Sequence, residues 1–109
     1  MFKMRKKNKY GAVKTKVDGI LFDSKAEASR YMVLVLLERQ GEIQRLELQP
    51  KFDCIVNSKK ICSYRADFRY FTNRGVVVED VKGMKTPVYR IKKKLVEALY
   101  PGVKIQEVQ

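Results

Sequence analysis

The chain has 109 residues, of which 45% are hydrophobic, so it can form one domain around one modest core. Its 24 lysine and arginine residues against 12 acidic residues give a formal net charge of +12, which predicts a polyanionic partner. Nucleic acid is the default partner, and an acidic membrane surface is the alternative. The sequence has no histidine, which excludes Ser-His, Cys-His and histidine-metal chemistry, and no apolar run approaches the roughly 18 residues of a membrane-spanning helix.

The first ten residues are strongly basic, and we interpret residues 1–10 as a flexible arm that precedes a single domain over residues 11–109. No apolar segment follows the basic start, so we expect no export and a cytoplasmic location. Cys54 and Cys62 are then expected to be reduced core residues, close to each other across a hairpin. A structural zinc site is not expected.

The first helix is expected to begin at Ser24, because Ser24 and Glu27 have the spacing of a capping box, and to end at Gly41. Before this helix, residues 17–22 are expected to form a short extended or turn element around an Asp-Gly pair. The helix carries a wide apolar surface, so we expect it to be largely buried. This surface comprises Ala28, Tyr31, Met32, Val35 and Leu36.

Alternating apolar residues and turn residues then predict three strands, at 52–56, 61–71 and 76–82. A second helix is expected from Thr86 as N-cap, with Pro87 at the first helical position, and a last strand over 103–108. The residues of this helix that we expect to face the core are Val88, Ile91, Leu95 and Leu99. The order of elements is α-β-β-β-α-β, which indicates an α/β fold.

The segment Val76–Gly83 contains the most informative pattern, three valines followed by Glu79, Asp80, Val81, Lys82 and a glycine. Because side chains of a strand alternate between its two faces, Asp80 and Lys82 point to one side and Glu79 to the other. A carboxylate and a lysine at the end of a buried strand pack poorly. The carboxylate can, however, hold a divalent metal beside a phosphate, and the ammonium can lie where negative charge develops or where a water must lose its proton. The pattern therefore predicts a metal-dependent site, with Asp80 favoured over Glu79 as the ligand.

A second carboxylate is expected beside Asp80 if the turn at 73–75 contains a two-residue loop. Asp67 then lies directly opposite Asp80, and Arg65 lies opposite Lys82. Like charges in opposed positions repel each other, and a shared cation would relieve the repulsion. A three-residue loop with a glycine bulge would instead shift the register by one residue. An apolar row on the other face of the strand independently places Asp67 on the face of the site: Ala66, Phe68 and Tyr70.

Glu27 is a third candidate ligand, and two interpretations of it stay open. As the N3 residue of the capping box, it can have a purely structural role. It also lies in the first turn of a helix whose later turns are almost entirely apolar, so it is expected close to the sheet. A carboxylate near Asp67 and Asp80 would fit a site of oxygen ligands for a hard cation. The two roles can coexist.

These features resemble the PD-(D/E)XK nuclease superfamily, with a helical Glu27, Asp67 on a strand, and Asp80-Val81-Lys82 at the end of the next strand. The resemblance covers about residues 9–108, through KYGAVKT, FDSKAEASRY, LQPKF, YRADFRY, VVVEDVKG and TPVYRIKKK, and points to a small phage and prophage branch grouped with Holliday-junction-resolvase-like endonucleases. It implies a restriction-endonuclease-like α-β-β-β-α-β core, with a mixed central sheet flanked by helices. One departure is the alanine before Asp67, where the superfamily has a proline that supplies geometry and no ligand.

The resemblance implies metal-assisted phosphodiester hydrolysis. Asp67, Asp80 and the carbonyl of Val81 would hold Mg²⁺, with Mn²⁺ as a substitute, and Glu27 would complete the site directly or through water. Lys82 would position or activate the attacking water and stabilise charge on the phosphate. The residues expected to contact DNA phosphates are Lys14, Lys16, Lys85, Tyr89, Lys92 and Lys93. A solvated charged face remains the alternative for the second helix.

The function predicted from the sequence is a phage or prophage DNA endonuclease that is structure-selective, resembles Holliday junction resolvases and acts in the cytoplasm of a bacterial host. A homodimer is expected, because two nicks in a junction need two sites and one chain supplies one. Two alternatives stay open: a non-catalytic nucleic-acid-binding module that uses the same basic surface, and a restriction-type or transposon-end nuclease. Metal dependence of cleavage would separate an enzyme from a binding module.

Overall fold

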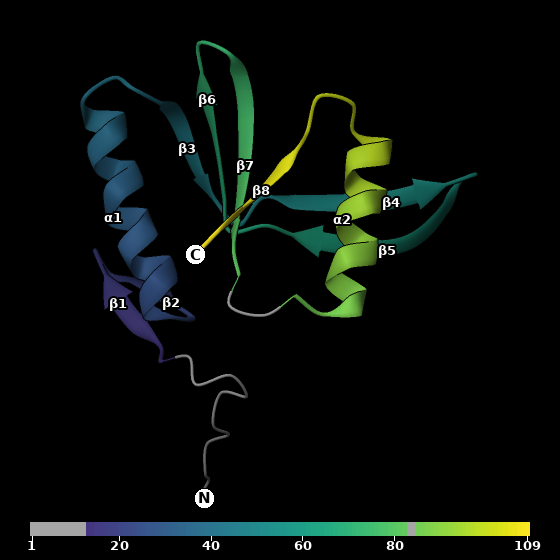
Figure 1. Cartoon of the computed structure of the whole chain (residues 1–109), viewed down its shortest axis with the longest axis horizontal. Coiled ribbons are helices and arrows are strands. Elements are labelled where there is room, and N and C mark those ends of the chain that lie inside the picture. Colours follow the sequence, from purple (N-terminus) through teal and green to yellow (C-terminus); the bar gives the residue numbers. More distant parts are fainter. Residues whose placement is uncertain (1–12, 83–84) are drawn as a thin grey trace, which may run out of the picture.

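The computed structural model describes residues 13–82 and 85–109, so the arm predicted for residues 1–10 lies outside the described part of the chain. Within these residues the elements in chain order are β1 (Thr15–Val17), β2 (Ile20–Phe22), α1 (Lys25–Arg39), β3 (Gln44–Leu48), β4 (Lys51–Val56), β5 (Lys59–Arg65), β6 (Phe68–Thr72), β7 (Gly75–Val81), α2 (Pro87–Leu99) and β8 (Ile105–Val108) (Figure 1). Neither of the described helices has the length and apolar character needed to cross a bilayer.

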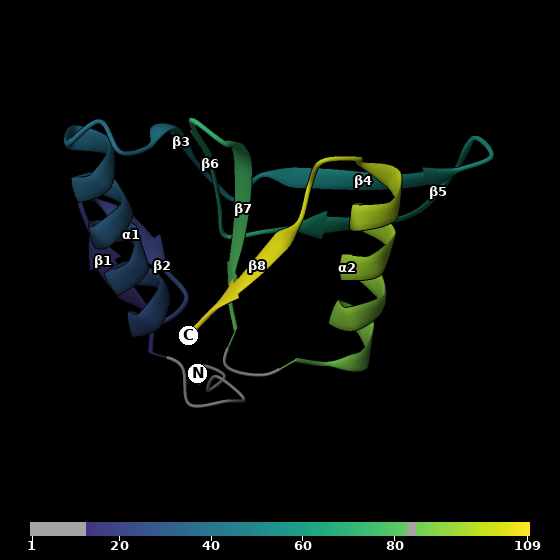
Figure 2. The ribbon, with the colours of Figure 1, turned by 45° about the horizontal axis from the view of Figure 1, so that its top comes forward.

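The central sheet has four strands in the order β3-β6-β7-β8, in which β7 and β8 are parallel and the other neighbours are antiparallel. Helix α1 lies on one side of this sheet, and α2 lies on the other side together with the β4-β5 hairpin (Figures 1 and 2). The β1-β2 hairpin lies beside the N-terminal end of α1. The chain therefore has the predicted α/β fold class, with a mixed central sheet between two helices.

The predicted order α-β-β-β-α-β is too short, because the described residues have two strands before α1 and five strands between the two helices. Only the central sheet with its two helices follows the order α1-β3-β6-β7-α2-β8, and its first strand is not the predicted one. That strand is β3, which the sequence does not predict, because its residues are mostly polar and exposed and a register shift interrupts its pairing near Arg45. The strand expected at 52–56 is β4, which pairs with β5 in a separate hairpin.

The strand expected over 61–71 is in fact two strands, because the chain leaves one sheet and enters another between β5 and β6. β5 remains paired with β4, so Arg65 lies opposite Lys51. The prediction that Arg65 lies opposite Lys82 is therefore wrong. β6 then pairs with β7 in the central sheet. Asp67 lies in the two-residue interval between β5 and β6.

Two apolar clusters lie on either side of the central sheet, and they explain this break. The cluster on the α1 side contains Phe22, Ala28, Leu34, Ile43, Phe68 and Tyr70. The cluster on the α2 side contains Phe52, Cys54, Tyr64, Ala66, Val78, Tyr89, Val96 and Ile105. The three residues expected as one apolar row are all buried, but Ala66 belongs to the second cluster and Phe68 to the first. The chain therefore crosses from one side of the sheet to the other at Asp67.

Helix α1 has the predicted ends but not the predicted burial. The Ser24 hydroxyl accepts a hydrogen bond from the Glu27 N–H at 3.1 Å, and Gly41 beyond the helix has a φ of +79°, which favours glycine. Three apolar residues of α1 are 51%, 45% and 54% exposed, respectively: Met32, Val33 and Leu36. Apolar residues surround this helix, but the sheet covers only one stripe of it, so its buried residues are Glu27, Ala28 and Leu34.

Helix α2 has the predicted cap, in which the Thr86 hydroxyl accepts a hydrogen bond from the Tyr89 N–H at 3.1 Å, but its buried face is rotated. Val88 and Ile91 are 62% and 61% exposed, contrary to the prediction, whereas Tyr89 and Val96 are buried. The other two predicted core residues are partly buried: Leu95 and Leu99. The apolar residues of α2 form two rows, each with helical spacing and displaced from the other by one residue. The large ring of Tyr89 packs inward against β5, whereas Val88 in the neighbouring row is exposed.

The β4-β5 hairpin brings the two cysteines together, as predicted. Cys54 and Cys62 are register partners, and both are free thiols. The turn residues Asn57 and Ser58 both have positive φ, as a two-residue hairpin loop requires. The same backbone conformation occurs at Asp18 and Gly19, between β1 and β2.

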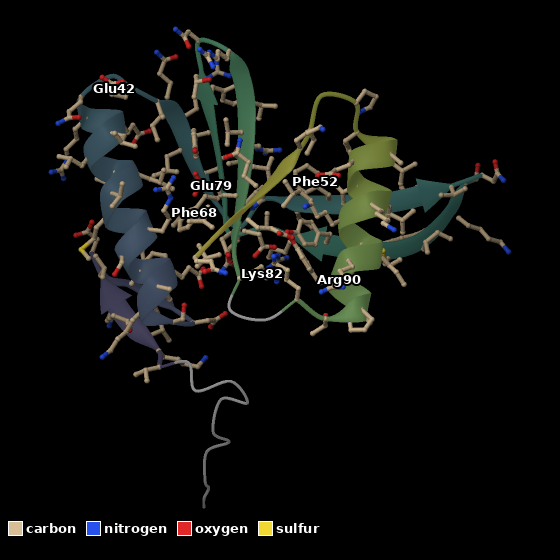
Figure 3. All side chains as sticks on the ribbon, in the orientation of Figure 1. Glu42, Phe52, Phe68, Glu79, Lys82 and Arg90 are labelled. Carbon is tan, nitrogen blue, oxygen red and sulfur yellow. The ribbon has the colours of Figure 1, made fainter. Side chains whose placement is uncertain are left out.

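A buried ion pair joins α1 to the central sheet. Glu79 of β7 is 1% exposed and faces α1 (Figure 3). The Arg30 guanidinium donates two hydrogen bonds to its carboxylate, from Nε at 2.7 Å and from Nη2 at 2.6 Å. The Tyr70 hydroxyl donates a third. This bidentate geometry fixes the position of α1 against β7.

We expect Arg30→Ala to lower the free energy of unfolding by about 3–5 kcal/mol, because it leaves the buried Glu79 carboxylate without its cationic partner. Arg39→Ala removes an exposed arginine from the last turn of the same helix and should change stability by no more than about 0.5 kcal/mol. Urea unfolding followed by circular dichroism measures both values. Equal stability of the two variants would contradict the role of this pair.

Candidate active site

Four of the predicted site residues come from three elements that meet at the end of β7. Asp80 is on β7, and Lys82 is the first residue after this strand. Asp67 lies just before β6, and Glu27 is in the first turn of α1. Figure 3 shows Lys82 at the end of β7, on the side of the loop that leads to α2. The sequence therefore predicts the location of this cluster correctly.

The register between β6 and β7 is the one expected for a two-residue loop. The ladder extends from Thr72 opposite Gly75 to Phe68 opposite Glu79, which rules out the three-residue loop and the one-residue shift. Asp67 continues this pairing, because its N–H donates to the Glu79 carbonyl at 3.1 Å. Its carboxylate accepts a hydrogen bond from the Val81 N–H at 2.7 Å. The Asp67 side chain is thus held beside Asp80.

Asp80 is 3% exposed, and its two carboxylate oxygens have different partners. The Tyr64 hydroxyl donates a hydrogen bond to Oδ2, and the Lys82 ammonium lies 3.5 Å from Oδ1. The same ammonium lies 4.3 Å from the centre of the Tyr89 ring, close enough for a cation–π contact. Asp80 and Lys82 therefore share one face of β7, as the alternation predicts, and Glu79 on the other face is engaged by Arg30.

Burial and mutual repulsion raise the pKa values of the acids in this cluster. The pKa of Asp67 rises to about 6, mainly through burial and further through the charge of Glu27, against the lowering effect of the Val81 N–H. The pKa of Asp80 rises to about 7, mainly through burial and further through the charge of Asp67, although Tyr64 and Lys82 lower it. Burial also raises the pKa of Glu27. The fold therefore places three carboxyl groups where they favour the neutral form or a nearby cation.

The chemistry of these donors fits a hard divalent cation, since carboxylate oxygens are the protein ligands that Mg²⁺ prefers. Within residues 13–82 and 85–109, no group of three or more Asp, Glu, Cys or His side chains is arranged so that it could hold a metal ion as it stands. A cation here would therefore depend on Asp67 and Asp80, with the Val81 carbonyl or water in other positions. Glu27 contacts Asp67 and lines the same cavity.

Two cavities border the cluster. One of about 240 Å³ is lined by Ile20, Leu21, Phe22, Glu27, Leu48, Gln49 and Asp67. The other, of about 200 Å³, is lined by Ala26, Val81, Lys82 and Gln109. Gln49 lines the first cavity, and its N–H donates to the Asp67 carbonyl at 2.9 Å. The first cavity therefore gives access to Glu27 and Asp67 and the second to Lys82, whereas Asp80 lines neither of them.

The residues predicted to contact DNA do not form one surface. Lys85, Tyr89 and Lys93 converge on the carboxylate of Glu107 in β8. Lys92 lies elsewhere on α2, near the Cys54 thiol, whose pKa is raised mainly by burial although the Lys92 charge acts in the opposite direction. The two N-terminal lysines are on the first strand of the β1-β2 hairpin, or just before it: Lys14, which lies 3.6 Å from Asp23, and the exposed Lys16.

The structure adds residues to the cluster that the sequence does not indicate. Tyr64 contacts Asp80 from β5, and Glu107 holds the basic group from β8. Neither has a local sequence signal, because each reaches the site through strand pairing. Arg30 had a usable signal, since it lies one helical turn after Glu27 and thus on the same face of α1.

Comparison with known proteins places the chain in a family. Residues 7–109 match the model of a family described as a protein of unknown function, DUF1064. The chain belongs to the DUF1064 family. The match covers the whole described domain, including β1 and β8 and every residue of the carboxylate cluster. No curated protein and no solved structure gives a significant match to this DUF1064 chain.

The raised pKa values predict that the protein becomes less stable as the pH rises. In the unfolded chain the two aspartates have ordinary pKa values near 3.8, whereas in the folded chain Asp67 and Asp80 keep their protons up to about pH 6 and about pH 7. Protonation therefore contributes stability that is fully present below about pH 4 and is lost as the pH rises to about 7. In EDTA, the thermal midpoint should fall across this range by several degrees.

Differential scanning calorimetry at several pH values measures this dependence. Asp80→Asn should flatten the profile, because the amide does not titrate. Asp18→Asn, which changes an exposed turn residue, should leave it as steep as in the natural protein. A thermal midpoint that stays constant or rises between pH 4 and pH 7 would show that the two aspartates titrate normally.

Proposed function

We propose that this chain is a metal-dependent DNA endonuclease that hydrolyses phosphodiester bonds. The observation that carries the proposal is the pair of adjacent aspartates, the partly buried Asp67 and the buried Asp80, with the Lys82 ammonium against Asp80. A structural role alone does not explain two adjacent carboxyl groups with raised pKa values, one of which lines a cavity together with Glu27. The order α1-β3-β6-β7-α2-β8 of the central sheet and its helices supports the same proposal, as does the resemblance of the motif to the PD-(D/E)XK superfamily.

Asp67, Asp80 and the Val81 carbonyl would hold Mg²⁺ or Mn²⁺, and Glu27 would complete the site through water. Bound in this way, the metal would polarise the scissile phosphate and lower the pKa of a bound water. In the overall reaction, a water oxygen forms a bond to phosphorus and the bond from phosphorus to one sugar oxygen breaks. A proton from the water ends on the departing oxygen.

Lys82 and its neighbours supply the other part of the chemistry. The ammonium is held between the Asp80 carboxylate, at 3.5 Å, and the Tyr89 ring, at 4.3 Å from its centre. A fixed positive charge at this place stabilises negative charge that develops on the phosphate oxygens. Tyr64 and the Val81 N–H hold the two aspartates in orientation, so they act as positioning groups.

The proposed substrate is branched DNA, cut by a homodimer in the manner of a junction resolvase of phage or prophage type. The net charge of +12 supports a polyanionic substrate. Helix α1 exposes three apolar side chains that could form a contact between two copies: Met32, Val33 and Leu36. A restriction-type or transposon-end nuclease would share the same chemistry, and cleavage of a four-way junction, a flap and linear duplex side by side separates these substrates.

A DNA-binding module without catalysis is the second candidate. It is favoured by one observation: in the described residues, no three potential ligands are arranged to hold a metal, and both oxygens of Asp80 already have partners. Such a module would bind DNA equally well in EDTA and in Mg²⁺ and would leave it intact. Mg²⁺-dependent appearance of cut strands therefore decides between the two functions.

Asp67→Asn and Asp80→Asn should each abolish Mg²⁺-dependent cleavage, because an amide is a poor ligand for Mg²⁺. DNA binding should persist or become tighter, since each change removes a negative charge. Cleavage of labelled DNA and fluorescence anisotropy measure these two effects, with Asp18→Asn as the folded control. If Glu79→Gln abolished cleavage while Asp80→Asn cleaved normally, the assignment of the two faces of β7 would be wrong.

Lys82→Ala should lower the single-turnover rate about 10²- to 10³-fold, the usual effect of removing one group that stabilises transition-state charge. Mg²⁺ uptake, measured by titration calorimetry, should be largely retained. Lys104→Ala, which removes an exposed lysine between α2 and β8, should leave the rate unchanged and serves as the matched control. Normal turnover of the Lys82 variant would remove this lysine from the mechanism.

A further inference from the structure

Glu107 of β8 is surrounded by three donors from a different part of the chain. The Tyr89 hydroxyl donates to Oε2 at 2.8 Å, and the Lys93 ammonium lies 3.4 Å from the same oxygen. The Lys85 ammonium lies 3.0 Å from Oε1. These donors lower the pKa of Glu107 to about 2, the Tyr89 hydroxyl having the largest effect. The carboxylate is therefore permanently charged at neutral pH.

This group lies next to the proposed catalytic residues. β7 and β8 are parallel neighbours, and Glu107 is the register partner of Asp80. Tyr89 connects the two places, because its hydroxyl contacts Glu107 and its ring carries the Lys82 ammonium. An anion held by the three donors would therefore lie one strand away from the carboxylates that face the scissile phosphate.

The three donors are a suitable set for a phosphate group. Two ammonium groups and one hydroxyl bind phosphate oxygens as readily as carboxylate oxygens, because both acceptors are anionic. Residues 82–94 carry six basic side chains and no acidic one, and the acid that contacts Lys85 and Lys93 comes from β8.

We propose that Lys85, Tyr89 and Lys93 form a subsite for one DNA backbone phosphate, and that Glu107 fills this subsite in the free protein. The inference rests on the proposed function and assigns the subsite to a phosphate next to the scissile one. DNA must displace the Glu107 carboxylate to occupy this subsite, so Glu107 weakens the binding of DNA that reaches it.

The test is the affinity of Glu107→Gln for a labelled duplex in EDTA. The glutamine keeps the size of the side chain and an acceptor for Tyr89, but it no longer holds the two lysines by charge. Glu42→Gln makes the same change in net charge at the far end of α1, away from Lys82 (Figure 3). We expect Glu107→Gln to bind DNA several-fold more tightly than Glu42→Gln, with a salt dependence steeper by about one phosphate contact.

Affinity of Glu107→Gln equal to or below that of Glu42→Gln would overturn the proposal. A second comparison covers the case in which Glu107→Gln does not fold. Lys93→Gln and Lys94→Gln remove neighbouring lysines of one helix, and we expect weaker DNA binding from Lys93→Gln. Equal affinity of these two variants would also overturn the subsite.

The outcome separates the subsite from the proposed function, because the binding experiment contains no metal. Tighter binding by Glu107→Gln with no Mg²⁺-dependent cleavage by the natural protein would support the subsite and contradict the nuclease. Normal cleavage by the natural protein with no gain from Glu107→Gln would support the nuclease and contradict the subsite.

Discussion

The alternation of side chains along β7 is the constraint on which the rest of the structure depends. This strand lies between two helical layers, so both of its faces are covered, and each face carries an acid. On the α1 side, Glu79 is neutralised by the bidentate Arg30 and fixes the helix to the sheet. On the α2 side, Asp80 keeps a raised pKa of about 7 beside Asp67. Of these two consecutive residues, Glu79 stabilises the packing of α1 on the sheet, and Asp80 belongs to the candidate site.

The sequence predicts this fold well where the signal is local. The caps at Ser24 and Thr86 and the loop between β6 and β7 depend on neighbouring residues, and all three are correct. The break between β5 and β6 is not predicted, because the alternation of 61–71 continues through it and only the two core clusters require the chain to cross. The rotated buried face of α2 has the same cause. Two rows of its residues have the same helical spacing, and the strand that packs against the helix determines which row is buried.

The same distinction holds for the candidate site. Asp80 and Lys82 follow from strand alternation, and Asp67 follows from the register of one hairpin. Tyr64 belongs to a hairpin outside the central sheet, and Glu107 lies 14 residues beyond Lys93. Their positions depend on how separate elements pack, which a one-dimensional pattern does not contain. For this reason the basic residues of α2 look unpaired in the sequence, although three groups near its start are already held by one carboxylate.

The β4-β5 hairpin leaves and re-enters the central fold at nearly the same point. The Ala66 N–H donates to the Pro50 carbonyl at 3.1 Å, and the Gln49 N–H donates to the Asp67 carbonyl at 2.9 Å, which closes the base of the hairpin next to the site. Its tip extends away from the sheet (Figure 1). An excursion closed at its base can grow or shrink at the tip without moving Asp67. The tip of the hairpin is therefore the place where residues can be added to this domain while the carboxylates keep their positions.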